Sequence, residues 1–251
     1  KDQIFDELKT LLEHPKYALT PRFALSCDSE TLLSLKGLVS PKRFVQTHLS
    51  ETQREIEETL NLYKQWPEFR DVDSYLEIYQ RAGLIQKRCI LGHCIHLTDQ
   101  EWKILADTQA AVAHCPTSNA PQDQRGLGSG LFELERARQE GVRWALASDI
   151  GAGPYLSMLD VMQSFLKQHR AAGRMVSARE ALYRASVAGA NILEAYQLTG
   201  FKPGNLASFI VFSSTSSSEP DECIEQLLDY SRDDYNQLSR AVCHSGRLEV
   251  F

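Results

Sequence analysis

Residues 44–51 read FVQTHLSE, a short apolar run that stops at a histidine and is followed three residues later by a glutamate. Short runs rich in β-branched and aromatic side chains are typical of strands. We therefore expect a strand over Phe44–Thr47 that ends at His48. The polar stretch after it, through about Lys64, predicts a long helix. A strand followed by a helix is the repeating unit of an α/β fold.

The same strand-then-helix pattern recurs on both sides of this stretch. Further short strands are predicted at Tyr17–Leu19, Cys89–Gly92, Ala110–Ala113 and Val142–Ala147. Helices are predicted near Ile4–Leu12, at Ser74–Ala82 with Gly83 as C-cap, from Thr98 with a Thr98/Glu101 capping box, and near Phe132–Gln139. Five short strands alternating with helices indicate a parallel sheet of β-α units.

The last hundred residues change in character. Two helices are predicted at Leu156–Ala172 and Ala178–Ala188, the second starting from a Ser177/Glu180 capping box. A strand at Ser208–Phe212, an exposed loop at Ser213–Pro220 and a hairpin over Ala241–Val250 complete the chain. We therefore expect an α/β domain over residues 1–200 and a small β-rich unit over residues 201–251.

The composition excludes several classes of function. The formal net charge is −6 and no basic run occurs, which argues against a nucleic-acid partner. No apolar stretch reaches the roughly 18 residues of a membrane span, and no signal-like pattern opens the chain. The six cysteines are scattered without a C-x-x-C pair, which indicates reduced thiols in a cytoplasmic protein.

Three potential metal ligands follow three different predicted strands. His48, His93 and Asp149 stand at carboxyl strand ends, where parallel α/β folds place their chemistry. A single histidine there is more often structural, but three such residues at equivalent positions favour a site. Histidine and carboxylate ligands suit a hydrolytic zinc ion. Glu51, three residues after His48, is either a proton carrier beside the metal or an acid in the first turn of the next helix.

The remaining histidines show weaker patterns. His114 also follows a strand and is interpreted as orienting neighbouring groups. His96 is expected in a loop, at the surface or behind the metal ligands, because Thr98 begins the next helix. His14, His169 and His244 have no partner pattern and are predicted at the surface.

Six segments resemble guanine deaminases of the amidohydrolase superfamily and occur in the same order. They are residues 20–23 (TPRF), 46–51 (QTHLSE), 92–94 (GHC), 113–119 (AHCPTSN), 127–132 (LGSGLF) and 148–153 (SDIGAG). The likeness runs from about residue 17 to 205. It implies a (β/α)8 barrel of the TIM type, of which this chain would carry about the last five β-α units, with a small C-terminal β unit.

The resemblance also implies the chemistry. Zinc would be held by His48, His93 and Asp149. Glu51, Asp149 and His93 would be catalytic, with Glu51 as proton shuttle and Asp149 also taking a proton from the attacking water. Arg22 would hold the purine by its planar donor fork and Phe23 would pack on the ring. The expected reaction is hydrolytic deamination of guanine to xanthine and ammonia in purine catabolism, by a cytoplasmic enzyme that is a homodimer at full length.

Several departures from the family pattern keep other interpretations open. The chain contains no His-x-His pair, and it lacks the first three barrel strands and the N-terminal part of the small β domain. Residues 120–126 look like an insertion. The alternatives are a truncated, catalytically incomplete chain that acts only with a missing half or a partner, and an aminohydrolase for another purine or a pterin. For Arg22 the alternative is a surface ion pair.

Overall fold

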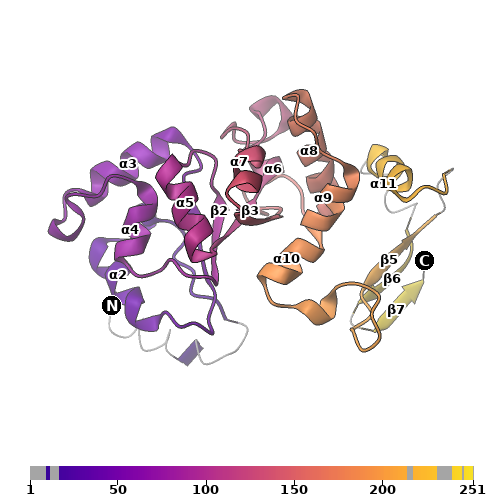
Figure 1. Cartoon of the computed structure of the whole chain (residues 1–251), viewed down its shortest axis with the longest axis horizontal. Helices are drawn as coiled ribbons and strands as arrows, with labels where there is room; N and C mark the ends of the chain where they lie inside the picture. Colours follow the sequence, from indigo (N-terminus) through magenta and orange to yellow (C-terminus); the bar gives the residue numbers. More distant parts are fainter. Residues whose placement is uncertain (1–9, 12–16, 214–216, 231–238, 245, 251) are drawn as a thin grey trace. The chain divides into compact units, whose positions relative to one another are not determined.

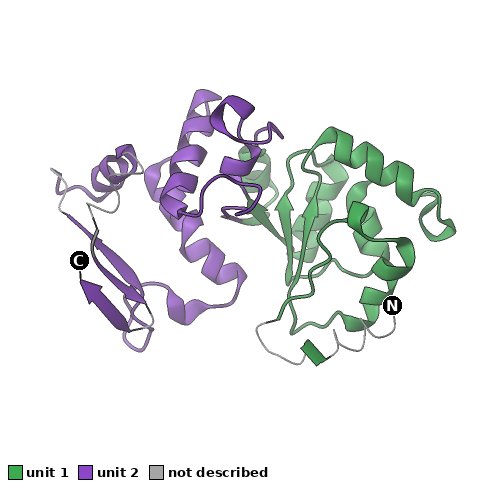
Figure 2. Ribbon diagram, turned by 180° about the vertical axis from the view of Figure 1, so that it is seen from behind, with its two compact units in different colours: residues 1–114, 132–144 green, residues 115–131, 145–251 purple. Residues whose placement is uncertain are grey.

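The computed structural model describes all residues except 1–9, 12–16, 214–216, 231–238, 245 and 251. The helix predicted near Ile4–Leu12 lies almost wholly outside the described residues. The described chain divides into two compact units, shown in green and purple in Figure 2. Unit 1 comprises residues 1–114 and 132–144, and unit 2 comprises residues 115–131 and 145–251. The boundary predicted at residue 200 remains a prediction.

Unit 1 is built on a parallel sheet, of which β2 and β3 are labelled in Figure 1. Its strands are β1 (Val45–Leu49), β2 (Cys89–His93), β3 (Ala111–His114) and β4 (Arg143–Leu146), in the order β1-β2-β3-β4, and the first half of β4 belongs to unit 1. β1 pairs with β2, and β2 with β3, in parallel. The predicted parallel α/β sheet is thus confirmed. The strand predicted at Tyr17–Leu19 is reduced to one bridge between Leu19 and Val45.

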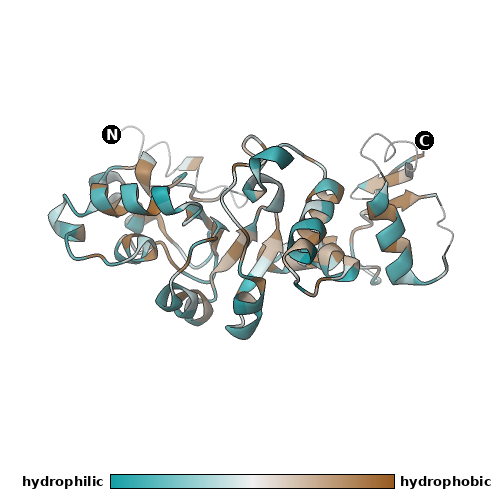
Figure 3. Cartoon of the chain, turned by 90° about the horizontal axis from the view of Figure 1, so that it is seen from above, coloured by the Kyte–Doolittle hydropathy of each residue, from teal (hydrophilic) through white to brown (hydrophobic). Residues whose placement is uncertain are grey.

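Unit 1 contains the helices that the sequence predicts after its strands, and a further short helix before β1 that was not predicted. They are α2 (Ser29–Ser34), α3 (Gln53–Tyr63), α4 (Tyr75–Arg81), α5 (Asp99–Thr108) and α7 (Leu134–Gln139), with 3-10 turns η1 (Ala24–Ser26), η2 (Leu35–Leu38) and η3 (Pro67–Phe69). The capping box at the start of α5 is confirmed, and Gly83 has φ +68° just after α4. Many of these helices carry hydrophilic and hydrophobic residues on different faces, as the two colours of Figure 3 show.

Large aromatic side chains fill the core of unit 1 beside β3. Trp102, Phe132 and Trp144 are almost fully buried, and their ring centroids lie 5.6–5.9 Å apart where Phe132 contacts the two tryptophans. His114, at the end of β3, stacks on Phe132 with centroids 4.8 Å apart. Each such ring removes a large apolar area from water. The cluster therefore fixes the strands whose ends carry the polar residues of interest.

Unit 2 combines a helical layer with a separate sheet. Its helices are α6 (Pro116–Asn119), α8 (Met158–Ala171), α9 (Ala178–Ala185), α10 (Val187–Ile192) and α11 (Pro220–Asp229), with 3-10 turns η4 (Gln122–Gln124) and η5 (Tyr196–Leu198). Its strands are β5 (Phe209–Phe212), β6 (Ser239–His244) and β7 (Arg247–Val250), all antiparallel. The predicted hairpin is confirmed, whereas α11 was not predicted. Of the helices described, none has the length and apolar character that crossing a membrane requires.

Candidate functional site

His48 and His93 lie side by side at the carboxyl ends of adjacent strands. Within the β1–β2 ladder, His48 is opposite Gly92 and His93 is opposite Leu49. Their ring centroids are 5.1 Å apart, with the ring planes inclined by 32°. His93 is 1% exposed and His48 is half-buried. Gly92 stands beside the His48 ring; a Cβ there would lie 3.8 Å from His48 Cδ2, an ordinary van der Waals distance.

The hydrogen bonds of His48 decide which of its nitrogens is available. Nδ1 lies 2.6 Å from the backbone oxygen of Arg22. A carbonyl oxygen can only accept, so Nδ1 must carry the hydrogen. In the neutral imidazole the lone pair is then on Nε2, which is the state that a metal-binding histidine needs. The His48 ring therefore fits the role of metal ligand.

The backbone at the ends of β1 and β2 adopts an unusual conformation. Ser50, His93 and Cys94 have φ values of +50°, +68° and +53°, a left-handed region that costs most non-glycine residues free energy. Hydrogen bonds hold this arrangement: Cys94 N–H donates to Leu49 O at 2.9 Å, and Ile95 N–H donates to Ser50 O at 3.1 Å. Such strained backbone clusters at functional sites, where it fixes the direction of side chains.

Glu51 lies close to the second histidine. Its Oε1 is 3.5 Å from His93 Nδ1, and its side chain is 19% exposed. The interpretation of Glu51 as a first-turn helix acid is wrong: Thr52 is the N-cap of α3, and Glu55 is the acid of the first turn. Glu55 Oε2 also accepts from the Glu51 backbone N–H at 2.8 Å. The helix start therefore holds the Glu51 backbone and leaves its carboxylate to face His93.

Arg22 and Phe23 approach the same strand end from the N-terminal side. The His48 backbone N–H donates to Arg22 O at 3.0 Å. The Arg22 guanidinium carbon lies 5.0 Å from the centre of the Phe23 ring, a cation–π arrangement. The Phe23 ring centroid is 6.1 Å from that of His48. Arg22 is exposed and Phe23 half-buried, so both are open to a ligand.

Asp149 belongs to unit 2 and follows β4. It has φ +49°, and its backbone oxygen accepts from Ala152 N–H at 3.1 Å and from Gly153 N–H at 2.6 Å. Gly153 is required for this turn, since a Cβ there would lie 2.2 Å from Ser148 O. The half-buried Asp149 carboxylate is thus carried on a tight, defined turn.

The other histidines serve packing or lie elsewhere. His114 is buried in the aromatic cluster of unit 1. The prediction of a surface position is wrong for His169, which is fully buried in α8 with its ring centroid 4.7 Å from that of Phe165. It is confirmed for His244, which is exposed. His14 lies outside the described residues.

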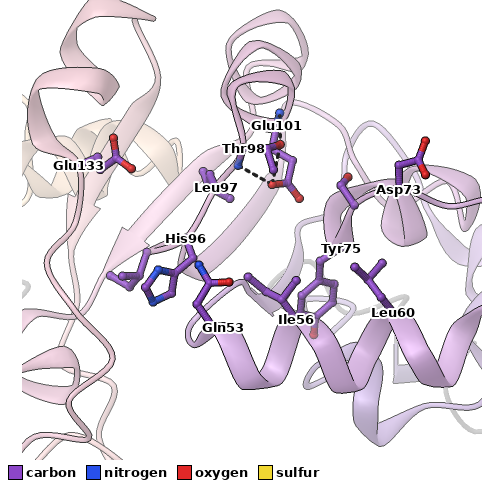
Figure 4. Close-up of a pocket in the computed structure, with 12 residues that line it drawn as sticks. Gln53, Ile56, Leu60, Asp73, Tyr75, His96, Leu97, Thr98, Glu101 and Glu133 are labelled. Atoms are coloured by element: carbon purple, nitrogen blue, oxygen red, sulfur yellow. Dashed lines mark hydrogen bonds between the residues drawn. The ribbon is translucent and has the colours of Figure 1, made fainter.

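His96 lies in the loop between β2 and α5, as expected, and lines a pocket of about 280 Å³ in unit 1. Figure 4 shows Gln53 and His96 near each other at this pocket, with Glu101 hydrogen-bonded to Thr98. Glu101 is 2% exposed and also accepts from Leu76 N–H at 3.0 Å. Its carboxylate therefore joins the starts of α4 and α5, which is a structural role.

Three buried tyrosines behind the histidines were not predicted. Tyr63, Tyr75 and Tyr79 direct their hydroxyl groups at backbone atoms of the segment after Arg22. The only hint in the sequence is that Tyr75 and Tyr79 are four residues apart, on one face of a predicted helix. That spacing indicates a packed face, but it does not reveal which polar atoms the hydroxyls meet.

The model of the amidohydrolase family matches residues 7–238, which is most of the sequence. The chain belongs to the amidohydrolase family. Among curated members, the guanine deaminase of Escherichia coli K12 is 39% identical over 204 residues, covering 80% of this chain and 44% of the relative. The chain therefore spans less than half the length of this relative.

Solved structures of similar fold include guanine deaminases. The Escherichia coli guanine deaminase structure superposes with a TM-score of 0.83 at 34% identity, covering 96% of this chain and 57% of that one. A guanine deaminase from C. acetobutylicum with guanine bound in its active site gives 0.77 at 26% identity, covering 93% and 55%. An adenosine deaminase from Xanthomonas campestris with bound zinc gives 0.80 at 20% identity, covering 99% and 56%, and shows the fold alone.

Proposed function

We propose that this chain is the part of a guanine deaminase that carries one metal-binding face and the proton carrier of the site. The observation that carries the proposal is the His48–His93 pair, with His48 Nε2 left available by the Arg22 carbonyl and with Glu51 beside His93. The six guanine-deaminase-like segments and the 39% identity to the Escherichia coli enzyme support guanine as substrate.

The donor set suits zinc. Two imidazoles and one carboxylate, from His48, His93 and Asp149, are the kinds of group that bind a hydrolytic zinc ion and leave a position for water. Zinc bound there would supply the Lewis acidity that lets water attack at neutral pH. The Xanthomonas campestris adenosine deaminase, a structure of similar fold, contains zinc.

The other steps, substrate binding and proton transfer, are assigned to individual residues of the chain. Arg22 binds the polar edge of the purine through its planar donor fork, and Phe23 packs on the ring. Asp149 takes a proton from the attacking water, and His93 holds its neighbours in place at the end of β2. Glu51 carries a proton to the leaving amino group, which departs as ammonia. Water and guanine are consumed, and xanthine and ammonia are formed.

The wider organisation is part of the same proposal. The chain would form about the last five β-α units of a (β/α)8 barrel with a small β unit after it, within a cytoplasmic homodimer that binds a small purine and neither nucleic acid nor membrane. The second candidate function is a catalytically incomplete chain that acts only with further sequence. It is favoured by one observation, since the chain spans 44% of its Escherichia coli relative.

The proposal is tested by zinc binding and by ammonia release. Zinc affinity would be measured for the 251-residue chain and for the variants His48→Ala, His93→Ala and Asp149→Ala, with His244→Ala as an exposed-histidine control. Each ligand variant should lose at least about 10-fold in affinity, on the scale seen for metal-site groups, and the control should match the parent. Ammonia release from guanine would then be measured for the longest protein that contains this chain. Parent-like zinc affinity in all three variants, or turnover of another purine in preference to guanine, would contradict the proposal.

A further inference from the structure

The hydroxyl of Tyr79 joins two parts of the proposed site. Tyr79 comes from α4, is fully buried, and donates to the backbone oxygen of His48 at 2.9 Å. It accepts from the Ala24 N–H at 2.9 Å and from the Thr47 hydroxyl at 3.0 Å. A tyrosine hydroxyl has one hydrogen and two lone pairs, so these three bonds can be made together; the Tyr75 hydroxyl lies 3.3 Å from the same oxygen. One atom thus connects the end of β1 with the turn that follows Arg22 and Phe23.

Thr47 extends this connection to the Arg22 backbone. Its hydroxyl lies 3.0 Å from the Tyr79 oxygen and 3.3 Å from Arg22 O. The same Arg22 oxygen accepts from the His48 ring at Nδ1 and from the His48 backbone N–H. The Thr47 hydroxyl has a single hydrogen, which it shares between Tyr79 Oη and Arg22 O. Tyr79 and Thr47 are thereby linked to the oxygen that also accepts from the imidazole proposed to bind metal.

The two neighbouring tyrosines hold the turn but not the strand. Tyr75 is 3.2 Å from Ala24 N, and Tyr63 donates to Ala24 O and Cys27 O at 3.2 and 3.0 Å. Of these three hydroxyls, only that of Tyr79 is hydrogen-bonded to β1 in the described contacts. A phenylalanine at position 79 would fill nearly the same space and keep the packing, so the hydroxyl serves something other than core volume.

We propose that Tyr79, acting through Thr47, is a positioning residue that sets the Arg22–Phe23 segment and the His48 ring relative to each other. The inference rests on the proposed function, because it assigns purine binding to Arg22 and Phe23 and metal binding to His48. Without the Tyr79 hydroxyl, Tyr63 and Tyr75 still hold the turn and Arg22 O still accepts from His48, but no tyrosine hydroxyl joins the turn to β1. The turn can then shift against β1, and small misplacements of binding groups are costly for catalysis.

The test compares Tyr79→Phe with a matched set of threonine variants. Thr47→Val removes the linking hydroxyl at nearly constant shape, whereas Thr47→Ser keeps it. Thr59→Val is the control, because Thr59 is also a fully buried threonine and its hydroxyl makes no hydrogen bond in the structure. Zinc affinity, KM and kcat for guanine, and thermal unfolding would be measured in the longest protein that contains this chain.

Tyr79→Phe and Thr47→Val should each raise KM about 10-fold, at the lower end of the effect of groups behind a metal ligand, with a smaller change in kcat. Both should weaken zinc binding several-fold, while Thr47→Ser and Thr59→Val stay near the parent. If Tyr79→Phe does not fold, the Thr47→Val and Thr47→Ser pair decides. Parent-like KM and zinc affinity in Thr47→Val, or equal losses in Thr47→Ser or Thr59→Val, would overturn the inference.

A further variant, His48→Ala, separates the two proposals. If His48→Ala loses zinc while Tyr79→Phe and Thr47→Val behave like the parent, the positioning role is wrong and the metal site stands. If His48→Ala keeps its zinc and its turnover, the proposed function itself fails.

Discussion

Glu51 is held by its backbone and presents its carboxylate to His93. The Glu55 side chain fixes the Glu51 N–H, and Glu51 Oε1 lies 3.5 Å from His93 Nδ1. Glu51→Gln keeps the size and the polarity of this side chain but cannot carry a proton. We expect turnover of guanine to fall roughly 100-fold or more, on the general acid–base scale, with zinc affinity unchanged. Turnover near that of the parent would exclude Glu51 as the proton carrier.

Replacing Arg22 distinguishes a binding role from a catalytic role, because the loss of a binding contact mainly raises KM whereas the loss of a catalytic group mainly lowers kcat. Its side chain is exposed and packs over Phe23, while only its backbone oxygen is tied to His48. Arg22→Ala should therefore raise KM for guanine at least about 10-fold, with thermal unfolding unchanged and kcat less affected, as expected when a binding contact is removed. Arg22→Lys is the informative companion, because it keeps the charge and loses the planar fork. An unchanged KM in both variants would show that Arg22 does not bind guanine and is a surface residue.

How well the contacts of a single residue can be predicted depends on how far apart the contacting residues lie along the chain. His48 and His93 could be placed together because parallel strands end at the same edge of a sheet, so the motif and the topology give the same answer. The bonds of Tyr79 to Thr47 and Ala24 cross 32 and 55 residues. No local pattern encodes such contacts, since they depend on how α4 packs on the sheet. His169 was misplaced for the same reason, because a polar residue on an amphipathic helix can still face the core.

Elements with a local chemical signal were predicted well. The Thr98/Glu101 box at the start of α5 and the antiparallel hairpin of β6 and β7 are examples. At the start of α9, Ser177 accepts from Glu180 N–H at 3.1 Å, as predicted. Thr52 and Glu55 carry the same signature at α3 and were overlooked. Leu19 forms only a bridge because Pro21 lies two residues on, and proline cannot donate to a ladder.

The turn after β4 allows the role of a backbone turn, rather than of one side chain, to be tested. Gly153→Ala would place a Cβ 2.2 Å from Ser148 O, so the turn that carries Asp149 must change its path. We expect zinc affinity to fall about 10-fold and the free energy of unfolding to fall by about 1–3 kcal/mol, as for other overpacked sites. Gly37→Ala is the matched control, because a Cβ at Gly37 meets nothing within 4 Å. Equal behaviour of the two variants would show that the turn tolerates a side chain.

At the scale of the whole molecule, the open question is how much the 251 residues can do alone. The chain has no His-x-His pair and spans 44% of its Escherichia coli relative. In unit 2, large apolar side chains are exposed, among them Leu156, Met175 and Phe201 at 69%, 88% and 89%. Burying such side chains between molecules removes apolar area from water, which favours association.

We therefore expect residues 1–251, expressed alone with zinc, to be prone to aggregation and to release ammonia from guanine at a rate far below that of a longer protein containing them. Light scattering and an ammonia assay on the same preparation would measure both properties. A soluble monomer with clear zinc-dependent turnover would show that the three ligands His48, His93 and Asp149 suffice, and that the His-x-His pair of the family pattern is dispensable here.

The buried tyrosines also allow the opening of unit 1 to be followed by absorbance. Burial raises the pKa of Tyr63 and of Tyr75 well above the usual value of about 10. At a pH above the usual tyrosine pKa and below the raised pKa of Tyr63 and Tyr75, the folded state keeps protons that the unfolded state releases. The free energy of unfolding must therefore fall as the pH rises above about 10. After a sudden jump to alkaline pH, exposed tyrosines ionise at once. Tyr63 and Tyr75 ionise only as unit 1 opens, so the slow rise in tyrosinate absorbance gives the rate of that opening without any label.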